Sequence, residues 1–596
     1  MKKHFLSVII SGVIGMACLS AIPVSASGGT FADAYSKDCG VALPPVVLTD
    51  YAEGVVSGEE PPADVVLRVD ESLNLPDGTP LSQAYSEISE AAVPVFYVSE
   101  ESAAESLVQF IGDFQIKDGI LASDSPEILA SLRESCVSLQ GLLDFRSQNE
   151  YTLSQIRDIT NTSDAKIVLL DASQTTRENV RHLQERLLTV WCEAETDEEL
   201  YGAATSGCDG IYTQEPATAY DILSTFAEGT LLRMPMVVGH RGMYNEKQNT
   251  LAAAQEAYKA GADAIECDIY LTADDQIVIM HDAQLDSTTT GTGNVEEMTL
   301  SEIQQYEVDA GGGGENRPIP SLEEFFSEFK GKEVMHFVEI KSSDPAIVSA
   351  LKDLIAEYGV SDQVIVISFL KDQLALVREQ IPGISVGYLV NSAQEYDAEQ
   401  CLRTLAPINA TLNPSYEFVT NEQVRELAAR GITVWPWTYP NDASFDAAYM
   451  TGINGITTDY ADRTSECVVS LEAEDFVISA TDAGAQKLTA TVVTQKGEKY
   501  EVECEYLQIS GSMTLLQTGD GRYYAGHGSG VVVLQYTYES DHVSYTLYSE
   551  PITITSEKEN AAEPQGGCNS SLISGVLIVS SLVIISAIAA IGRKKG

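Results

Sequence analysis

Titratable side chains follow short apolar runs in the middle of the sequence, at points where strands would end. Met236-Val-Val leads into Gly239-His240-Arg241-Gly242, and Ile277-Val-Ile-Met leads into His281-Asp282. A histidine gives or takes a proton near neutral pH, and an arginine holds a phosphate through two parallel hydrogen bonds. Two histidines at the ends of neighbouring strands would supply the general base and general acid of a displacement at phosphorus.

Carboxylates with strand spacing indicate a metal site in the same region. Glu266 and Asp268 lie at i and i+2 in an apolar run, so they project from one face of a strand. They would repel each other without a cation, and their oxygens suit a hard ion such as Mg²⁺ or Ca²⁺. Glu339 and Lys341 repeat the spacing and offer a third ligand and a second phosphate contact. As isolated pairs, the two would also fit a solvated edge strand and a surface salt bridge.

The elements that position these residues occur twice. Short β-branched runs alternate with amphipathic helical segments, which is typical of βα units around a parallel sheet. Glu178-Asn-Val-Arg-His-Leu aligns with Glu422-Gln-Val-Arg-Glu-Leu, and each segment leads at the same spacing to a tryptophan, Trp191 and Trp435. The repeat predicts an α/β fold with two tandem TIM-type (β/α)8 barrels, residues 30–230 and 233–465.

Together these residues resemble the glycerophosphodiester phosphodiesterase family. The resemblance runs from His240-Arg241-Gly242 to Thr458-Asp459-Tyr460 in the second repeat. Besides the pairs above, it includes Asn249-Thr250, Gly291-Thr-Gly293, Ile319-Pro-Ser-Leu-Glu-Glu324 and Trp437-Thr438.

The resemblance implies a barrel with an insertion after its second strand, residues 283–320, whose run Gly311–Gly314 would make it mobile. It also implies one divalent cation, Mg²⁺ or Ca²⁺, held by Glu266, Asp268 and Glu339. The glycerol hydroxyl beside the phosphodiester is the expected internal nucleophile, giving a cyclic intermediate that water opens. The family pattern gives roles to six more side chains: His240 and His281 as acid and base, Arg241, Lys341 and Asn249 on the substrate, and Trp437 along the glycerol pocket.

Two departures from the family pattern bear on metal affinity and substrate preference. The family's Pro-Glu-Asn-Thr reads Lys247-Gln248-Asn249-Thr250, so an amide replaces a carboxylate near the expected metal. An arginine common in the family falls at Ser287 or its neighbour.

The first repeat lacks these residues. Leu43-Pro-Pro-Val-Val-Leu-Thr49 stands in place of His-Arg-Gly, and Leu67-Arg68-Val-Asp70 in place of Glu-x-Asp. Glu193 takes the position of Trp437. We therefore expect a degenerate, inactive barrel that serves as a scaffold, a pairing surface or a ligand-binding module.

The charge of the chain limits its partners. There are 35 basic and 88 acidic residues, a net charge of −53, which argues against nucleic acid and anionic lipid because both need excess Lys and Arg. Hydrophobic residues make up 44% of the chain, enough for real cores, so the acidity is expected on a solvated surface.

The two ends of the chain predict an exported protein with a membrane anchor. Residues 1–26 have the basic start, apolar run and small-residue end of a signal peptide. Residues 466–556 read as a small β-sandwich and 557–571 as a stalk. Residues 572–591 carry no charge and precede a basic tail, 592–596, so a single-pass helix with the bulk of the chain extracellular is expected.

The sequence thus predicts a metal-dependent enzyme at the outer cell surface that cleaves glycerophosphodiesters to glycerol 3-phosphate and an alcohol. Deacylated phospholipid headgroups and glycerophosphate polymers are both plausible substrates. One alternative is a phospholipase D-like enzyme acting on lysolipids; another is a non-catalytic surface binding protein. The second repeat keeps both histidines, three carboxylates, Arg241 and Lys341, which weighs against the latter.

Overall fold

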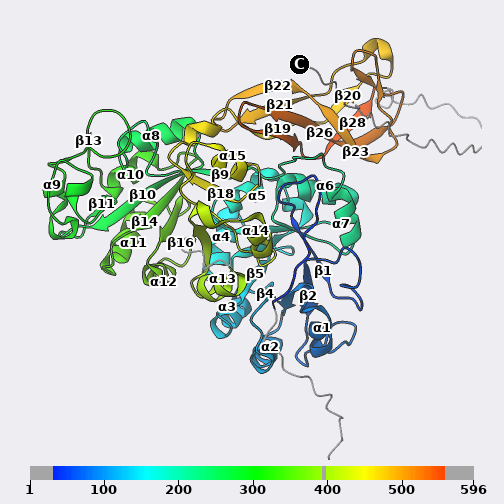
Figure 1. The fold of residues 1–596 in the computed structure, drawn as a ribbon. Coiled ribbons are helices and arrows are strands. Elements are labelled where there is room, and N and C mark those ends of the chain that lie inside the picture. The colour runs from blue at the N-terminus through cyan, green and yellow to red at the C-terminus, as the bar shows by residue number, and fades with distance from the viewer. Residues whose placement is uncertain (1–30, 149, 392–396, 558–596) are drawn as a thin grey trace, which may run out of the picture.

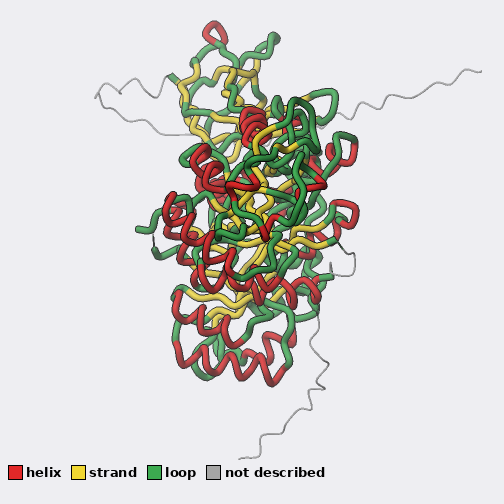
Figure 2. Tube along the Cα trace, turned by 90° about the vertical axis from the view of Figure 1, so that its left-hand side faces the viewer, coloured by secondary structure: helices red, strands yellow, loops and turns green. Residues whose placement is uncertain are grey.

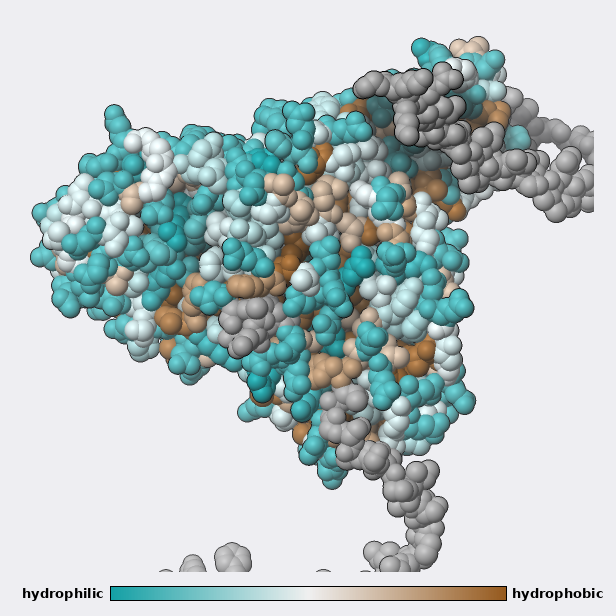
Figure 3. Space-filling view, viewed as in Figure 1, coloured by the Kyte–Doolittle hydropathy of each residue, from teal (hydrophilic) through white to brown (hydrophobic). Residues whose placement is uncertain are grey.

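The computed structural model describes residues 31–148, 150–391 and 397–557 as two β/α barrels and an all-β region (Figure 1). Strands run through the middle of the molecule, with helices at its periphery (Figure 2). The visible surface is mostly hydrophilic, as the excess of acidic residues requires (Figure 3). Within the described ranges, no helix has the length and apolar character needed to cross a bilayer. The predicted signal peptide and the predicted span 572–591 lie outside these ranges.

The first barrel is closed by eight parallel strands in chain order. Apolar runs such as Ile167–Leu170 fit strands that are buried on both faces. The strands are β1 Val46–Asp50, β2 Asp64–Arg68, β3 Val93–Tyr97, β4 Ile120–Ser123, β5 Gln140–Asp144, β6 Ile167–Leu170, β7 Thr189–Glu193 and β8 Gly210–Tyr212. The helices are α1 Leu81–Ile88, α2 Glu101–Phe114, α3 Pro126–Ser135, α4 Leu153–Thr162, α5 Arg177–Gln184, α6 Asp197–Ser206 and α7 Pro216–Leu223.

The second barrel has seven parallel strands in the order β17-β16-β15-β14-β10-β9-β18. Residues 434–439 bridge the gap between β17 and β18 through the pairs Leu412–Val434, Ser415–Trp437 and Tyr439–Thr458. Pro436 has no N–H to give to a ladder, which fits this sparse pairing. The strands are β9 Met236–Gly239, β10 Ala264–Leu271, β14 Met335–Ile340, β15 Val364–Ser368, β16 Val386–Val390, β17 Ala410–Pro414 and β18 Gly455–Thr458. The helices are α8 Leu251–Ala260, α10 Leu322–Phe329, α11 Ala346–Tyr358, α12 Lys371–Gln380, α13 Ala398–Leu405, α14 Asn421–Ala428 and α15 Ala443–Tyr449.

The strand before His281 corrects one expectation. β11 (Ile277–Ile279) runs antiparallel to β10, so it is a hairpin strand and not a strand of the barrel. The prediction that the two histidines end neighbouring strands was therefore wrong, because β10 lies between β9 and β11. A short apolar run looks the same in either direction, so its sequence does not reveal which way it pairs.

The insertion after β11 has a small core of its own. It contains α9 (Leu300–Ile303), β12 (Glu307–Val308) and β13 (Arg317–Pro318). Its glycine run lies against the loop after β9: Gly313 N donates to Tyr244 O at 3.1 Å, and a Cβ on Gly312 would overlap Glu246 O. Glycine is needed there because the backbones approach so closely. The expected mobility of this run stays a prediction. The core residues are Val278, Met280, Leu285, Val295, Ile303, Val308 and Ile319.

The C-terminal region consists of strands, as predicted. One sheet has the order β19-β21-β22, and a second the order β20-β28-β26-β23 with β27 paired to β26. Packing as a sandwich stays a prediction. The strands are β19 Val468–Glu472, β20 Phe476–Ile478, β21 Thr489–Thr494, β22 Lys499–Glu503, β23 Glu505–Gly511, β24 Leu516–Gln517, β25 Tyr523–Tyr524, β26 Ser529–Glu539, β27 Ser544–Tyr548 and β28 Ile552–Ser556.

The barrels meet at their amino-terminal ends through a reciprocal pair of ion pairs. Arg186 of the first barrel donates from Nε and Nη2 to Asp362 of the second, at 3.2 and 2.8 Å. Arg430 of the second donates from Nε and Nη2 to Asp118 of the first, at 2.8 and 2.7 Å. Arg430 and Asp362 both lie 244 positions after their counterparts. The sequence repeat therefore places equivalent residues in the two ion pairs, and the contact between the barrels has approximate twofold symmetry.

Each barrel also supplies a residue to the interior of the other. Leu187, which follows α5 in the first barrel, packs in the interior cluster of the second with Phe337 and Trp435. Ala429, which follows α14 in the second barrel, packs in that of the first with Trp191. The amino-terminal ends are thus closed against one another, and the carboxyl ends face away from this contact.

Candidate active site

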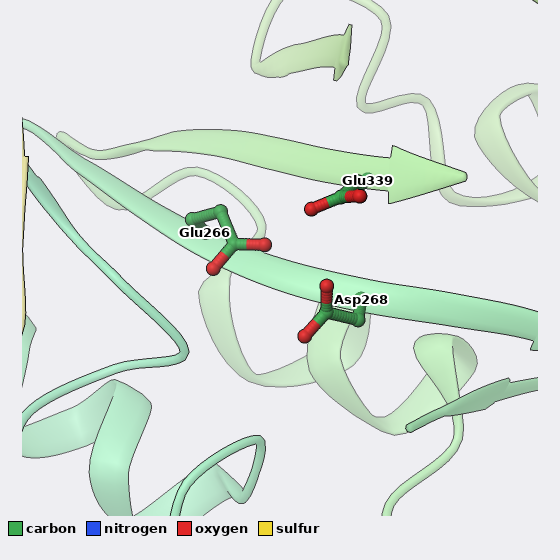
Figure 4. A group of neighbouring side chains, drawn as sticks. All are labelled: Glu266, Asp268 and Glu339. Carbon is green, nitrogen blue, oxygen red and sulfur yellow. The ribbon is translucent and has the colours of Figure 1, made fainter. Parts of the chain in front are cut away.

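Three carboxylates converge near the carboxyl end of the second barrel (Figure 4). Glu266 and Asp268 come from β10, and Glu339 comes from β14, where it lies beside Asp268 in the parallel register. Their side chains point toward one another, and one oxygen of each lies within 4.8 Å of the others. All three residues are at most 7% exposed. The predicted ligand set is therefore one compact, buried group.

Two cations and an amide surround these carboxylates. Arg241 Nε lies 3.1 Å from Asp268 Oδ2, and Lys341 Nζ lies 3.1 Å from Asp268 Oδ1 and 2.5 Å from Glu339 Oε1. Asn249 donates from Nδ2 to Asp268 Oδ2 at 2.7 Å. The backbone N–H of Arg241 donates to Glu266 Oε2 at 2.8 Å. Asp268 thus has an ion-pair partner at each oxygen but a side-chain hydrogen bond at Oδ2 alone, and Glu266 accepts a hydrogen bond at Oε2.

The donor set fits a divalent cation. Glu266 Oε1 is buried without a partner, and Lys341, although close, makes no well-aligned hydrogen bond to Asp268 Oδ1 or Glu339 Oε1. Burial and then the neighbouring carboxylates raise the pKa of Glu266 well above its ordinary value. Burial and then Asp268 raise the pKa of Glu339 to about 8. The three carboxylates outnumber the two cations beside them, and unpartnered oxygens of this kind suit Mg²⁺ or Ca²⁺.

A carboxylate orients each histidine. His240 directly follows β9, and its Nδ1 lies 2.7 Å from Asp459 Oδ1. His281 follows β11, and its Nδ1 lies 2.9 Å from Asp282 Oδ1. A partner at Nδ1 leaves Nε2 for a substrate. Burial lowers the pKa of His281, which favours the neutral ring.

An aromatic wall lies beside Lys341. Trp437 donates from Nε1 to Asn413 O at 2.9 Å, which fixes its indole. Its ring meets Phe369 edge to face at 5.4 Å between centroids, and Lys341 Nζ lies 5.7 Å from the Phe369 centroid. The two rings therefore form an apolar surface next to the Lys341 ammonium group, an arrangement suited to a ligand with carbon atoms beside an anionic group.

The structure brings together the residues predicted from the sequence and adds three that had no predicted role, although Asp459 and Gln248 lie in motifs of the resemblance. Direct contacts join His240 to Asp459, and Arg241, Asn249 and Lys341 to the carboxylates. His281 is tied in through Met280, whose N–H donates to Asp268 O at 2.9 Å. The three additions are Asp459, Phe369 and Gln248, whose Oε1 accepts from Arg241 Nη1 at 2.9 Å. Asp459 and Phe369 directly follow the carboxyl ends of β18 and β15. That position in a barrel is where site residues are expected, so it could have identified them as candidates.

The strand registers locate the equivalent places in the first barrel. Each barrel sets a glycine of its last strand, Gly210 or Gly455, against the repeated tryptophan. From this contact, the strand pairings identify equivalent positions in the two barrels. Asp50 is equivalent to His240. Val66 is equivalent to Glu266, Arg68 to Asp268, and Tyr97 to Glu339. We expected Leu67 to Asp70 at the Glu-x-Asp position, but the register places Val66 to Arg68 there. Among the described residues, the one group suited to a metal is in the second barrel.

Comparisons with known proteins agree with this geometry. Residues 240–463 match the glycerophosphoryl diester phosphodiesterase family. A glycerophosphodiester phosphodiesterase of Caldanaerobacter subterraneus subsp. tengcongensis is 33% identical over 230 residues, 38% of this chain and 93% of that protein. One of Bacillus subtilis is 29% identical over 264 residues, 40% of this chain and 89% of that protein. The structure of an Oleispira antarctica phosphodiesterase with the product sn-glycerol-3-phosphate is 25% identical, with a TM-score of 0.35, and covers 39% of this chain and 95% of that one.

The family match at residues 240–463 coincides with the barrel that holds both histidines and the three carboxylates, and the one-third-identical relative is matched over nearly its whole length. This chain belongs to the glycerophosphoryl diester phosphodiesterase family and is an enzyme.

Proposed function

We propose that the second barrel hydrolyses glycerophosphodiesters to sn-glycerol 3-phosphate and an alcohol. The observation that carries this proposal is the buried group of Glu266, Asp268 and Glu339 with two carboxylate-oriented histidines beside it. The relatives named above are glycerophosphodiester phosphodiesterases, and a related enzyme holds sn-glycerol-3-phosphate.

The substrate phosphate is held by side chains of this chain. A divalent cation bound by Glu266, Asp268 and Glu339 would supply Lewis-acid polarisation of the phosphoryl group. Arg241 and Lys341 lie against the same carboxylates and would bind the remaining phosphate oxygens. Trp437 and Phe369 would pack against the carbon atoms of glycerol. Asn249 would hold Asp268 in position through its hydrogen bond to Oδ2.

The histidines move the protons. Asp459 and Asp282 hold the Nδ1 sides of the rings, so Nε2 of one histidine can take a proton from the attacking glycerol hydroxyl. Nε2 of the other can give a proton to the leaving alcohol. The hydroxyl next to the phosphodiester is already held beside phosphorus, so its attack is effectively unimolecular. Water then opens the cyclic phosphate with the two roles exchanged.

We further propose that this reaction takes place at the outer cell surface. The support is in the sequence: an export signal in residues 1–26 and an uncharged segment, 572–591, before a basic tail. Deacylated phospholipid headgroups and glycerophosphate polymers are the two substrate pools that this location would offer.

The test is hydrolysis by a soluble protein covering residues 31–557. Release of sn-glycerol 3-phosphate is measured on glycerophosphocholine and glycerophosphoglycerol, with Mg²⁺ or Ca²⁺ and with EDTA, beside a His240→Ala control. We expect release that needs both the metal and His240. If neither diester is cleaved with either metal, lysolipids are tried next, and inactivity on those as well would leave a binding protein.

A further inference from the structure

The mouth of the first barrel carries an ordered polar network that the proposed reaction does not use. Arg68, at the end of β2, donates from Nε to Asp50 Oδ1 at 3.1 Å and from Nη2 to the Tyr212 hydroxyl at 3.3 Å. The Tyr212 hydroxyl donates in turn to Asp50 Oδ2 at 2.9 Å. Gln214 donates to the same hydroxyl at 3.0 Å. The ends of β1, β2 and β8 are thereby linked.

A second guanidinium extends the network across the mouth. Arg146 donates to Asp144 Oδ2 at 2.7 Å and to Glu193 Oε1 at 2.5 Å, and Tyr97 donates to Asp144 Oδ2 at 3.0 Å. Arg146 lies over the Tyr212 ring at 4.5 Å, as Arg68 lies over the Tyr97 ring at 4.1 Å. The tyrosines join the two halves into one group.

The network is open to solvent on its outer side. Tyr97, Asp144 and Tyr212 are buried, whereas the side chains of Asp50 and Glu193 are 33% and 30% exposed. By strand register it occupies the place that the active site occupies in the second barrel. Barrel enzymes of this type bind their ligands at this end.

Structural closure alone does not explain these residues. Near its amino-terminal end the interior of the same barrel is packed with apolar residues that include Ala429 and Trp191, and the ion pair there, Arg430 with Asp118, is buried in the contact with the second barrel. Partly buried ion pairs stabilise a fold no better than apolar residues of similar size, because desolvation offsets their attraction. Two guanidinium groups and three carboxylates at the opposite end therefore point to a ligand.

The chemistry of the mouth restricts that ligand. Asp50, Asp144 and Glu193 outnumber the two arginines and, unlike the carboxylates of the second barrel, do not form a group suited to a metal that could offset the excess, which disfavours a phosphate. One face of each tyrosine ring is covered by Arg68 or Arg146 and both residues are buried, so the rings do not form an open cage for a quaternary ammonium group. Carboxylates, guanidinium groups, phenols and an amide together offer the mixed donors and acceptors that hydroxyl groups need.

We propose that the first barrel binds a neutral polyhydroxy ligand, a saccharide or a polyol, at this mouth. Glu193 and Asp50 are the accessible acceptors, Gln214 a donor, and the buried members of the network fix their positions. The second barrel would then act on phosphodiesters while the first holds a hydroxyl-rich part of the same or another molecule.

The experiment uses the protein covering residues 31–557, as in the hydrolysis test, and three probes: glucose, N-acetylglucosamine and glycerol. Binding is followed by saturation-transfer NMR and titration, alongside hydrolysis of glycerophosphoglycerol. We expect saturable binding of at least one probe, with a Kd in about the millimolar range typical of weak ligands. Binding of glucose or N-acetylglucosamine without binding of glycerol would identify a saccharide site, and binding of glycerol would identify a polyol site.

Matched variants in the two barrels decide where the probe binds. Asp50→Asn and Glu193→Gln should weaken binding at least about tenfold, the loss of one charged hydrogen bond, and leave hydrolysis unchanged. His240→Ala, at the place equivalent to Asp50, should keep binding and lose hydrolysis. Unfolding curves check each variant, and the more exposed Glu193→Gln decides alone if Asp50→Asn does not fold.

Two outcomes would overturn the inference. One is the absence of saturable binding of all three probes. The other is binding that survives Glu193→Gln but disappears in His240→Ala, which would assign the probe to the second barrel. Because hydrolysis is measured separately, failure of the first-barrel site and failure of the proposed reaction give different results.

Discussion

Where the second barrel sets Asp268 beside Glu339, the first barrel sets Arg68 beside Tyr97 in the same parallel register. The backbones place side chains equivalently, and the reciprocal contacts at the other ends are similar too. In one barrel three carboxylates lie close enough together to hold an added cation; in the other, each of three carboxylates is paired with an arginine of the same barrel. The comparison shows that strand register fixes where chemistry can occur, and that a few side chains at the strand ends decide which chemistry.

The largest expected difference between the barrels is in catalysis. Asp268→Asn removes a ligand and the partner of both Arg241 and Lys341, so we expect kcat/KM to fall by about a thousandfold or more, since a bound cation contributes several kcal/mol. Arg68→Met, at the equivalent place, should leave kcat/KM unchanged. Glycerol 3-phosphate release measures both, and calorimetry with Mg²⁺ or Ca²⁺ should show binding lost in Asp268→Asn alone. A tenfold loss or less in Asp268→Asn would contradict the assigned role of this carboxylate.

Local spacing predicted part of the site and not the rest. The i, i+2 spacing of Glu266 and Asp268 determines their common face without any tertiary information. The contact of His240 with Asp459 joins residues 219 positions apart, and only the closing of the sheet brings them together. The repeat predicted two equivalent barrels, but its sequence does not say that Leu187 enters the other barrel's interior.

The two interbarrel ion pairs should differ in strength although the repeat makes them equivalent. The side chains of Arg430 and Asp118 are 0% and 2% exposed, so Arg430→Met leaves a buried charge and should cost about 3–5 kcal/mol of unfolding free energy. Those of Arg186 and Asp362 are 10% and 39% exposed, so Arg186→Met should cost about 1 kcal/mol or less. Urea denaturation monitored by circular dichroism compares the two variants.

A compensating variant checks the reason for that difference. Arg430→Met combined with Asp118→Leu removes both charges and should recover most of the lost stability, because apolar pairs replace buried ion pairs at little cost. Equal losses in Arg430→Met and Arg186→Met would show that burial does not set the strength of these contacts.

Acid should destabilise the second barrel more than the first. Burial lowers the pKa of His182 in the first barrel to about 4, but this ring is only partly buried. His336 is buried against Phe325 and Phe326, neither ring nitrogen has a partner, and burial lowers its pKa to about 3. The unfolded chain protonates this ring near pH 6.5, so stability is complete above that pH and declines as pH falls toward 3. At pH 5 the loss should be about 2 kcal/mol.

Replacing His336 isolates this effect. His336→Leu should flatten the decline in unfolding free energy between pH 7 and pH 5 relative to the original chain. The equivalent position in the first barrel is Pro94, which has no titratable group. If the pH dependence stays the same in His336→Leu, the imidazole is not the group that titrates.

The smallest expected effect distinguishes orientation from chemistry. Asp459 touches His240 and its side chain is 47% exposed, so water can partly replace it. We expect Asp459→Asn to lower kcat about tenfold with KM nearly unchanged, because the amide still holds the ring but stabilises its charged form less. Gln214, at the same place in the first barrel, should tolerate Gln214→Glu without change in hydrolysis. A loss as large as that of His240→Ala would mean that Asp459 takes part in the proton transfer itself. The replacement of this carboxylate by the amide of Gln214 would then be enough to prevent catalysis at the first barrel's equivalent position.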